Sequence, residues 1–218
     1  GEAEPVLDEP FVAAMRELLR HPSLDPAFKA LALTLPDEPY VAEQVTPVDP
    51  LRIHAVREAM RAQLAARLHG DWLWAWEQHQ VREGYEATGA QAGRRALANL
   101  ALSMLVLNAV RTGDEVWPGR AYQRVKDATN MTDRHGATWA LLAARAPLAE
   151  RALAHFHAAA QGDALVVDKW FALQAMAPEP VGAGPGQGVA RARALLKHPD
   201  FTLKNPNRAR SLVFSLCM

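Results

Sequence analysis

The stretch LANLALSMLVLNAV, residues 97–110, decides the fold class, because its apolar side chains cover nearly every side of a helix. A helix of that kind is usually central and packed all round. Roughly a fifth of the 218 residues are Ala, and Leu follows, and both are strong helix formers. β-Branched residues never alternate with polar ones over a strand-length run. The sequence therefore predicts an all-α protein.

Start signals predict where several of the other helices begin. Asp25-Pro26, Asp49-Pro50 and Asn205-Pro206 each place a capping oxygen before a proline at the first helical position. From about Pro50, residues 53, 56, 60, 64 and 68 form one apolar stripe at helical spacing, and Gly70 interrupts or ends that helix. Further helices are expected at 9–20, 27–34, 119–128, 133–145, 148–161, 165–177, 189–197 and 206–217.

Many short helices with short connections predict a superhelix of stacked antiparallel helix pairs, an armadillo- or HEAT-like α-solenoid, rather than a four-helix bundle. The segment Leu18-Leu19-Arg20-His21-Pro22 recurs as Leu195-Leu196-Lys197-His198-Pro199, which is one internal echo of a repeat. The Pro- and Gly-rich run 178–188 is expected to be a surface loop. We find no second boundary and expect a single domain over 1–218.

The composition limits the classes of function that the protein can have. The 24 basic and 24 acidic residues balance and are interspersed, which argues against a nucleic-acid partner. No run of 18 apolar residues occurs, so no membrane-spanning helix is expected. The start, Gly1 to Pro5, lacks the pattern of a signal peptide, and the single cysteine, Cys217, fits a reducing compartment. A cytoplasmic protein is expected.

No catalytic or metal-binding constellation emerges from the spacing. None of the eight histidines is followed by Glu, so the zinc-binding pattern His-Glu-x-x-His is absent. His155 and His157 point to different sides of a helix, and surface or capping roles are the expectation for the histidines. The run 182–188 fails the dinucleotide fingerprint, because Gln187 takes a glycine position and no strand precedes it. Trp72, Trp74 and Trp76 are expected to anchor core and loops rather than to stack on a ligand.

Three segments resemble a known family. Thr129-Asn130-Met131-Thr132-Asp133, Val167-Asp168-Lys169-Trp170-Phe171 and Asn205-Pro206-Asn207-Arg208-Ala209-Arg210-Ser211 are similar to the C-terminal region of bacterial aminopeptidase N, a family of zinc metallo-aminopeptidases. Segments 7–12 and 53–58 fit the same region in the same order, so the resemblance covers nearly the whole chain. The loop 178–188 departs from the pattern by being longer and richer in Gly.

The resemblance implies a helical C-terminal domain that covers the catalytic domain and closes the cavity through which peptides reach the zinc. The partners implied are an upstream catalytic domain of the same polypeptide and peptide substrates. The family's zinc helix, its exopeptidase motif and its transition-state tyrosine have no counterpart here. The chain is therefore expected to be a catalytically silent fragment without a cofactor, with zinc in the parent enzyme. By resemblance, Arg210 and Asn207 line the substrate chamber.

Two other function classes stay open at this point. The first is an independent helical-repeat scaffold that binds a protein partner in its concave face. The second is a small enzyme with a novel site, which no acid–base constellation supports.

The resemblance leads to two further expectations. The chain alone should neither bind stoichiometric zinc nor cleave aminoacyl-arylamides. Because the chain stops at Met218, where the family continues, an apolar stripe on the last helix should lie uncovered, with the helix frayed or covered by a neighbouring chain. The members of that stripe are Ala209, Leu212, Val213 and Leu216.

Overall fold

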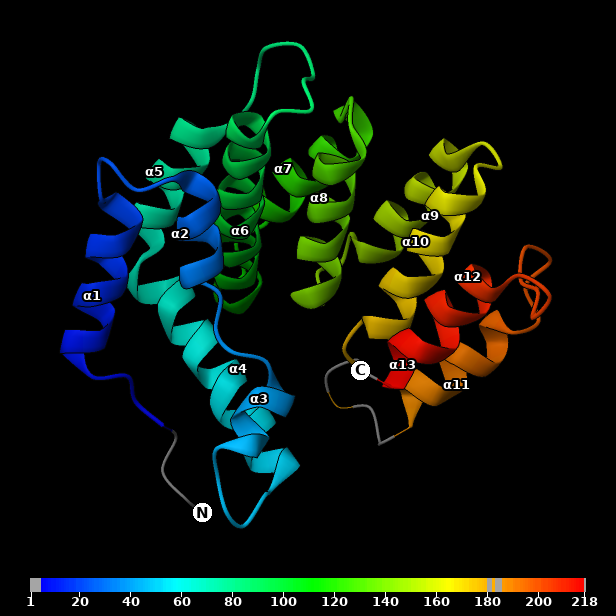
Figure 1. Cartoon of the computed structure of the whole chain (residues 1–218), viewed down its shortest axis with the longest axis horizontal. Coiled ribbons are helices and arrows are strands. Elements are labelled where there is room, and N and C mark those ends of the chain that lie inside the picture. The colour runs from blue at the N-terminus through cyan, green and yellow to red at the C-terminus, as the bar shows by residue number, and fades with distance from the viewer. Residues whose placement is uncertain (1–4, 180–181, 183–185, 218) are drawn as a thin grey trace. The chain divides into compact units, whose positions relative to one another are not determined.

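The computed structural model describes residues 5–179, 182 and 186–217, which are divided along the chain, between Gly113 and Asp114, into two compact units. Every regular element in these residues is a helix, which confirms the all-α prediction (Figure 1). The single domain expected over 1–218 stays a prediction. Residues 180–181 and 183–185 of the predicted loop lie outside the described residues, and the loop ends at Gly186 because a helix begins at Gln187.

The first unit is built around its longest helix. Its elements are α1 (Glu9–Arg20), α2 (Pro26–Ala32), α3 (Glu38–Glu43), α4 (Pro50–Arg67), α5 (His69–His79) and α6 (Gly89–Thr112). Helices α2, α4 and α5 all pack against α6 (Figure 1). Leu97, Leu102 and Leu105 of α6 are fully buried, so the prediction of a central helix over 97–110 is confirmed.

Helix α2 approaches α6 closely at a glycine. A Cβ atom placed on Gly93 would lie 2.9 Å from the backbone nitrogen of Ala27. Since real Cβ contacts are longer than this, Gly93 allows the two helix backbones to pack at a distance that a larger residue would prevent.

The tryptophan segment of α5 anchors the first unit, as predicted. Trp72 is 1% exposed, and its Nε1 donates a hydrogen bond to the backbone oxygen of Leu64 at 3.0 Å. Trp76 is also buried. Trp74 is half-buried beneath the guanidinium of Arg20, which lies 4.4 Å from the ring centroid.

The second unit consists of helices joined by short loops. Its elements are α7 (Val116–Asp127), α8 (Met131–Ala143), α9 (Ala149–Ala160), α10 (Ala164–Met176), α11 (Gln187–Leu195), α12 (Pro206–Ala209), the π-helical η1 (Arg210–Phe214) and α13 (Ser215–Cys217). Helix α8 packs against α7 and α9, and α9 packs against α10. The C-terminal helices lie on α10 (Figure 1). Neighbouring helices in the chain are therefore neighbours in space, as stacked pairs require.

The three predicted capped starts are confirmed, and two helices, α3 and α5, were not among those expected. The side chains of Asp25 and Asn205 each accept two hydrogen bonds from backbone N–H groups of the first turn, and that of Asp49 accepts one, with proline at the start of each helix. Helix α3 has the same device with one residue inserted, since Asp37 of Asp37-Glu38-Pro39 caps it. The identical triplet Asp8-Glu9-Pro10 begins α1. The repetition of this triplet was the signal that could have predicted α3.

No helix among the described ranges combines the length and the apolar character needed to span a bilayer.

Candidate substrate-facing site

The segment Asn205–Ser211 opens the C-terminal helix, and its local chemistry starts that helix. The side-chain oxygen of Asn205 accepts a hydrogen bond from the backbone nitrogen of Asn207 at 3.0 Å and a longer one from that of Arg208 at 3.4 Å. Pro206 fills the first helical position, where its missing N–H costs nothing. This cap sets the direction in which the following side chains point.

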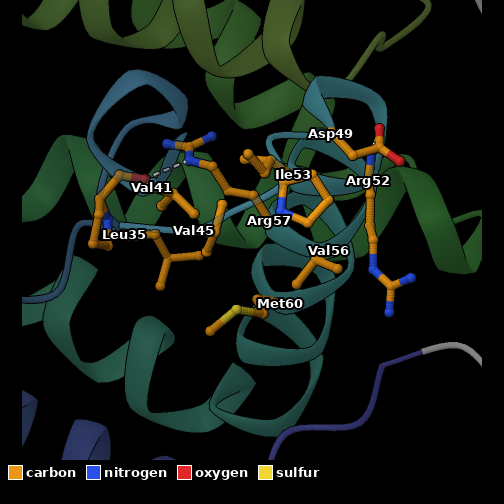
Figure 2. A pocket seen from close by; sticks show the side chains of 11 residues that line it. Leu35, Val41, Val45, Asp49, Arg52, Ile53, Val56, Arg57 and Met60 are labelled. Atoms are coloured by element: carbon orange, nitrogen blue, oxygen red, sulfur yellow. Dashed lines mark hydrogen bonds between the residues drawn. The ribbon is translucent and has the colours of Figure 1, made fainter. Parts of the chain in front are cut away.

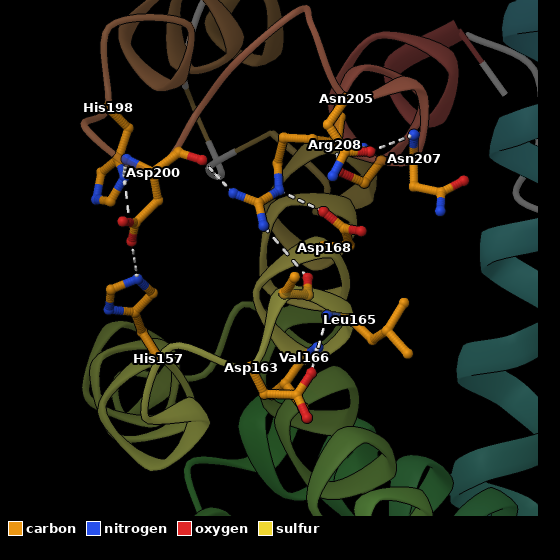
Figure 3. Close-up of polar contacts among 12 residues, drawn as sticks. His157, Asp163, Leu165, Val166, Asp168, His198, Asp200, Asn205, Asn207 and Arg208 are labelled. Carbon is orange, nitrogen blue, oxygen red and sulfur yellow. Dashed lines mark hydrogen bonds and ion pairs between the residues drawn. The ribbon is translucent and has the colours of Figure 1, made fainter.

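Arg208 turns inward from this helix and is held by three groups. Its Nε pairs with the carboxylate of Asp168, its Nη1 donates to the backbone oxygen of Asp200, and its Nη2 donates to that of Ala164 at 3.2 Å (Figure 3). The guanidinium carbon lies 5.2 Å from the centroid of the Phe171 ring. The Arg208 side chain is 8% exposed and that of Asp168 is 13% exposed. Arg208 therefore connects α12 both to α10, through Asp168 and Ala164, and to the loop between α11 and α12, through Asp200.

The segment Val167–Phe171 supplies the other half of this junction. Trp170 and Phe171 are buried, as expected, and Trp170 Nε1 donates to the backbone oxygen of Leu153 at 3.1 Å. Asp168 turns toward Arg208, whereas its neighbour Lys169 is exposed. The sequence could not show this pair, since 40 residues separate its members.

The third segment, Thr129–Asp133, stabilises a helix connection. Asn130 caps α8 by accepting a hydrogen bond from the backbone nitrogen of Asp133 at 2.9 Å, and its amide donates to the Asp133 carboxylate. Asp133 also pairs with Arg124 of α7 at 2.9 Å. All three segments that carry the family resemblance thus form structural junctions within the second unit.

Asn207 and Arg210, the two residues predicted to face the substrate, both lie on the exposed side of this last helix. Phe214, four residues after Arg210, is 61% exposed. Within the described part of the chain, the Arg210 guanidinium has no hydrogen-bond or ion-pair partner. Arg210 therefore offers all its donors to an outside group.

The expected apolar stripe is wrong for Leu212 and correct for Val213. Leu212 is 1% exposed in a segment that packs on α10, whereas Val213 is 48% exposed. Ala209 and Leu216 are half-buried. Leu212 is buried because its segment packs on α10, so the second unit itself covers part of the stripe. The π-helical turn over Arg210–Phe214 also takes more residues per turn than an α-helix, so the spacing used for the prediction does not hold across it.

The first unit has an apolar groove between α3, α4 and the segment that joins them. The groove encloses about 440 Å³, and Figure 2 shows Val41, Val45 and Ile53 pointing into it. Arg57 closes one side by donating from its Nε to the backbone oxygen of Pro36 at 2.8 Å. The predicted stripe on α4 therefore divides: Leu64 and Leu68 are in the core, whereas the residues nearer its start line this groove.

We expected surface or capping roles for the histidines, and this expectation does not hold for all of them. Burial lowers the pKa of His135 below its ordinary value, and the nearby charge of Lys169 lowers it further. His157 and His198 lie side by side, next to Asp200. Sequence reasoning missed this cluster because its members come from different helices and turns.

Comparison with known proteins agrees with the resemblance. A family described as "Domain of unknown function (DUF3458_C) ARM repeats" matches residues 1–218. Aminopeptidase N of Caulobacter vibrioides is 35% identical over 220 residues, which cover 98% of this chain and 24% of that protein. Aminopeptidase N of Escherichia coli is 32% identical over 200 residues, covering 92% of this chain and 22% of that protein. The chain thus spans about a quarter of the length of these curated relatives.

A solved structure shows the same fold. Aminopeptidase A of Legionella pneumophila, crystallised in complex with aspartic acid, superposes with a TM-score of 0.81 at 26% identity. The match covers 97% of this chain and 25% of that one. Together with the ARM repeats of the matching family, it confirms the predicted fold class.

Proposed function

Because the chain belongs to the family described as a domain of unknown function with ARM repeats, DUF3458_C, we propose that it works as the helical C-terminal domain of a longer aminopeptidase. In that parent it closes the chamber that holds the peptide substrate. Its partner is the upstream catalytic domain of the same polypeptide. The identity to aminopeptidase N over nearly the whole chain supports this role.

The parent's reaction is the hydrolysis of an N-terminal peptide bond, for which a zinc ion activates water and polarises the carbonyl group. This chain does not supply that centre, because none of its eight histidines begins a His-Glu-x-x-His pattern. Its own contribution is to bind and orient the peptide and to limit its access. The parent's cytoplasmic location is part of the proposal, and the single cysteine of this chain fits a reducing compartment.

One observation carries the proposal for the site: Arg208 is fixed inside the fold while Arg210 is free outside it. The three bonds of Arg208 hold the start of the last helix in place. Arg210 and Asn207 therefore project from a rigid support rather than from a loose terminus. A rigid support is what a residue needs if it is to meet a substrate at a defined distance.

The chemistry of Arg210 suits the far end of a short peptide. Its guanidinium presents paired N–H donors in a planar fork, which matches the two oxygens of a carboxylate. A short peptide whose N-terminus lies at the zinc ends in such a carboxylate. The amide of Asn207 adds both a donor and an acceptor for the peptide backbone. We therefore assign Arg210 to the terminal carboxylate and Asn207 to the adjoining peptide group.

The test is Arg210→Ala in the full-length parent enzyme. The loss of one charge-assisted contact should lower kcat/KM for tripeptides roughly tenfold, which corresponds to about 1.4 kcal/mol. Aminoacyl-arylamides have no far-end carboxylate and should be hydrolysed at nearly the original rate. Arg193→Ala is the matched control, because Arg193 is an exposed arginine of α11.

Equal losses on both substrates would show a structural defect, and no loss on either would remove Arg210 from the site. The rival scaffold function makes a different prediction. A protein partner bound by the repeats alone would leave peptide hydrolysis independent of Arg210.

A further inference from the structure

A cluster of two histidines and one aspartate lies at the surface of the second unit, outside the substrate-facing site. His157 comes from the last turn of α9, and His198 and Asp200 come from the turn after α11. His157 Nε2 lies 2.8 Å from Asp200 Oδ2, and His198 Nδ1 lies 3.8 Å from the same oxygen (Figure 3). One donor atom from each residue lies within 4.8 Å of the other two. Three metal-binding groups therefore converge on one point.

Buried aromatic rings hold the two imidazoles in place. The ring of Trp170 lies 4.5 Å from that of His157 and 5.0 Å from that of His198, measured between centroids. Phe171 contacts His198 edge-on at 5.7 Å. Because Trp170 and Phe171 are buried, the imidazoles rest on a fixed surface. Donor groups held in this way lose little freedom when a ligand binds.

The turn that carries His198 and Asp200 is fixed as well. The backbone nitrogen of Asp200 donates to His198 Nδ1 at 3.2 Å, and Arg208 binds the backbone oxygen of Asp200. The positive charge of Arg208 is paired with Asp168, which reduces its repulsion of a second cation nearby. A cavity of about 250 Å³ beside the cluster is lined by His157, Asp200 and Arg208, so water can complete a coordination shell.

The cluster is partly open to solvent. The side chains of His157, His198 and Asp200 are 33%, 27% and 44% exposed. Ion pairs at such exposure contribute at most about 1 kcal/mol. The same exposure leaves the donor atoms accessible from solvent, as a metal site requires.

The repeated segment, residues 18–22 and 195–199, allows this turn to be compared with its first copy. In the first copy, the backbone nitrogen of Ser23 donates to His21 Nδ1 at 3.4 Å, so the turn has the same form. That copy has Ser23 where the second has Asp200. The hydrogen bond within the turn is thus common to both copies, whereas the carboxylate and the second histidine are specific to the second copy.

We propose that His157, His198 and Asp200 bind a divalent transition-metal ion of the zinc class, with water in the remaining position. Two imidazoles and one carboxylate form a set that zinc accepts in a tetrahedral shell with one open site. Coordination by His198 Nδ1 would replace its hydrogen bond from Asp200. The bound ion would link α9 to the turn before α12. This proposal replaces the sequence-based expectation that the chain binds no zinc, which rested on the missing His-Glu-x-x-His helix.

The experiment is zinc titration of the 218-residue chain in competition with a chromophoric chelator, together with the visible absorption spectrum of the cobalt(II) form. We expect one ion per chain and the absorption bands of a four-coordinate cobalt site. His157→Ala and Asp200→Asn should each weaken binding at least about tenfold, because each removes a ligand. His21→Ala, in the first copy of the turn, is the matched control and should bind like the original chain.

The affinity should fall at acid pH, because a protonated imidazole cannot coordinate a metal ion. The cobalt spectrum of the unmodified chain tests the site even if a variant fails to fold. The absence of stoichiometric binding, or equal binding by the original chain and by both folded ligand variants, would overturn the proposal.

Discussion

Arg208 of α12 and Arg210, the first residue of η1, lie two residues apart in one continuous helical segment and have opposite environments. Arg208 is buried, and three acceptors bind its guanidinium, whereas Arg210 is exposed. Two residues along a helix turn the side chain by about 200°, so one arginine faces the second unit's interior and the other faces away from it. The comparison teaches that one motif can combine a structural residue with a residue free to bind. Each role can be tested separately.

The largest effect should come from Arg208→Ala. Removing the arginine leaves the largely buried Asp168 carboxylate without its ion-pair partner, a loss that typically destabilises a protein by about 3–5 kcal/mol. Urea unfolding followed by circular dichroism should show this as a lower free energy of unfolding. Arg208→Lys should recover only part of the lost stability, because an ammonium group cannot bind the three acceptors in the geometry of a guanidinium. Full stability in the alanine variant would contradict a structural role for Arg208.

Asn205→Ala should have an intermediate effect. Asn205 caps the helix that carries both arginines, and the loss of such a cap typically costs about 1 kcal/mol. We expect a correspondingly lower free energy of unfolding in the same urea assay. Asn205→Asp is the control, because it keeps an oxygen at the capping position and should retain most of the stability. Equal losses in both variants would show that the cap is not what Asn205 contributes.

The smallest effect on stability should come from Arg210→Ala. An exposed side chain outside any packed or paired group usually changes stability by less than about 0.5 kcal/mol. The urea midpoint should therefore stay close to that of the original chain, even though tripeptide hydrolysis by the parent is expected to fall. A large loss of stability would mean that the two arginines do not differ as described.

Much of the fold could be predicted from local patterns. Asp25, Asp49 and Asn205 each cap the helix that their following proline begins, and the apolar residues 97–110 form the central helix of the first unit. These features depend on interactions within a few residues, so the sequence contains them directly. Helix α3 escaped prediction because it is short and buries no side chain, although Asp37-Glu38-Pro39 repeats the start of α1.

The candidate sites could be predicted only in part. The resemblance singled out Asn207 and Arg210, and helical spacing separated them from Leu212. The expectation of an uncovered stripe failed at Leu212, because local spacing does not show that this segment packs on α10. The partner of Asp168 was missed for a different reason. Arg208 lies 40 residues away, and no local rule joins residues at that separation.

The sequence by itself determined that the chain is helical, where most helices begin, and which family it belongs to, because caps, apolar spacing and motif order are local or linear properties. The tertiary structure decided which arginine is buried, that the α4 stripe divides between core and groove, and that His157 meets Asp200. These outcomes depend on which surfaces pack together. Packing brings together residues that are far apart along the chain, so it is settled only when the helices assemble.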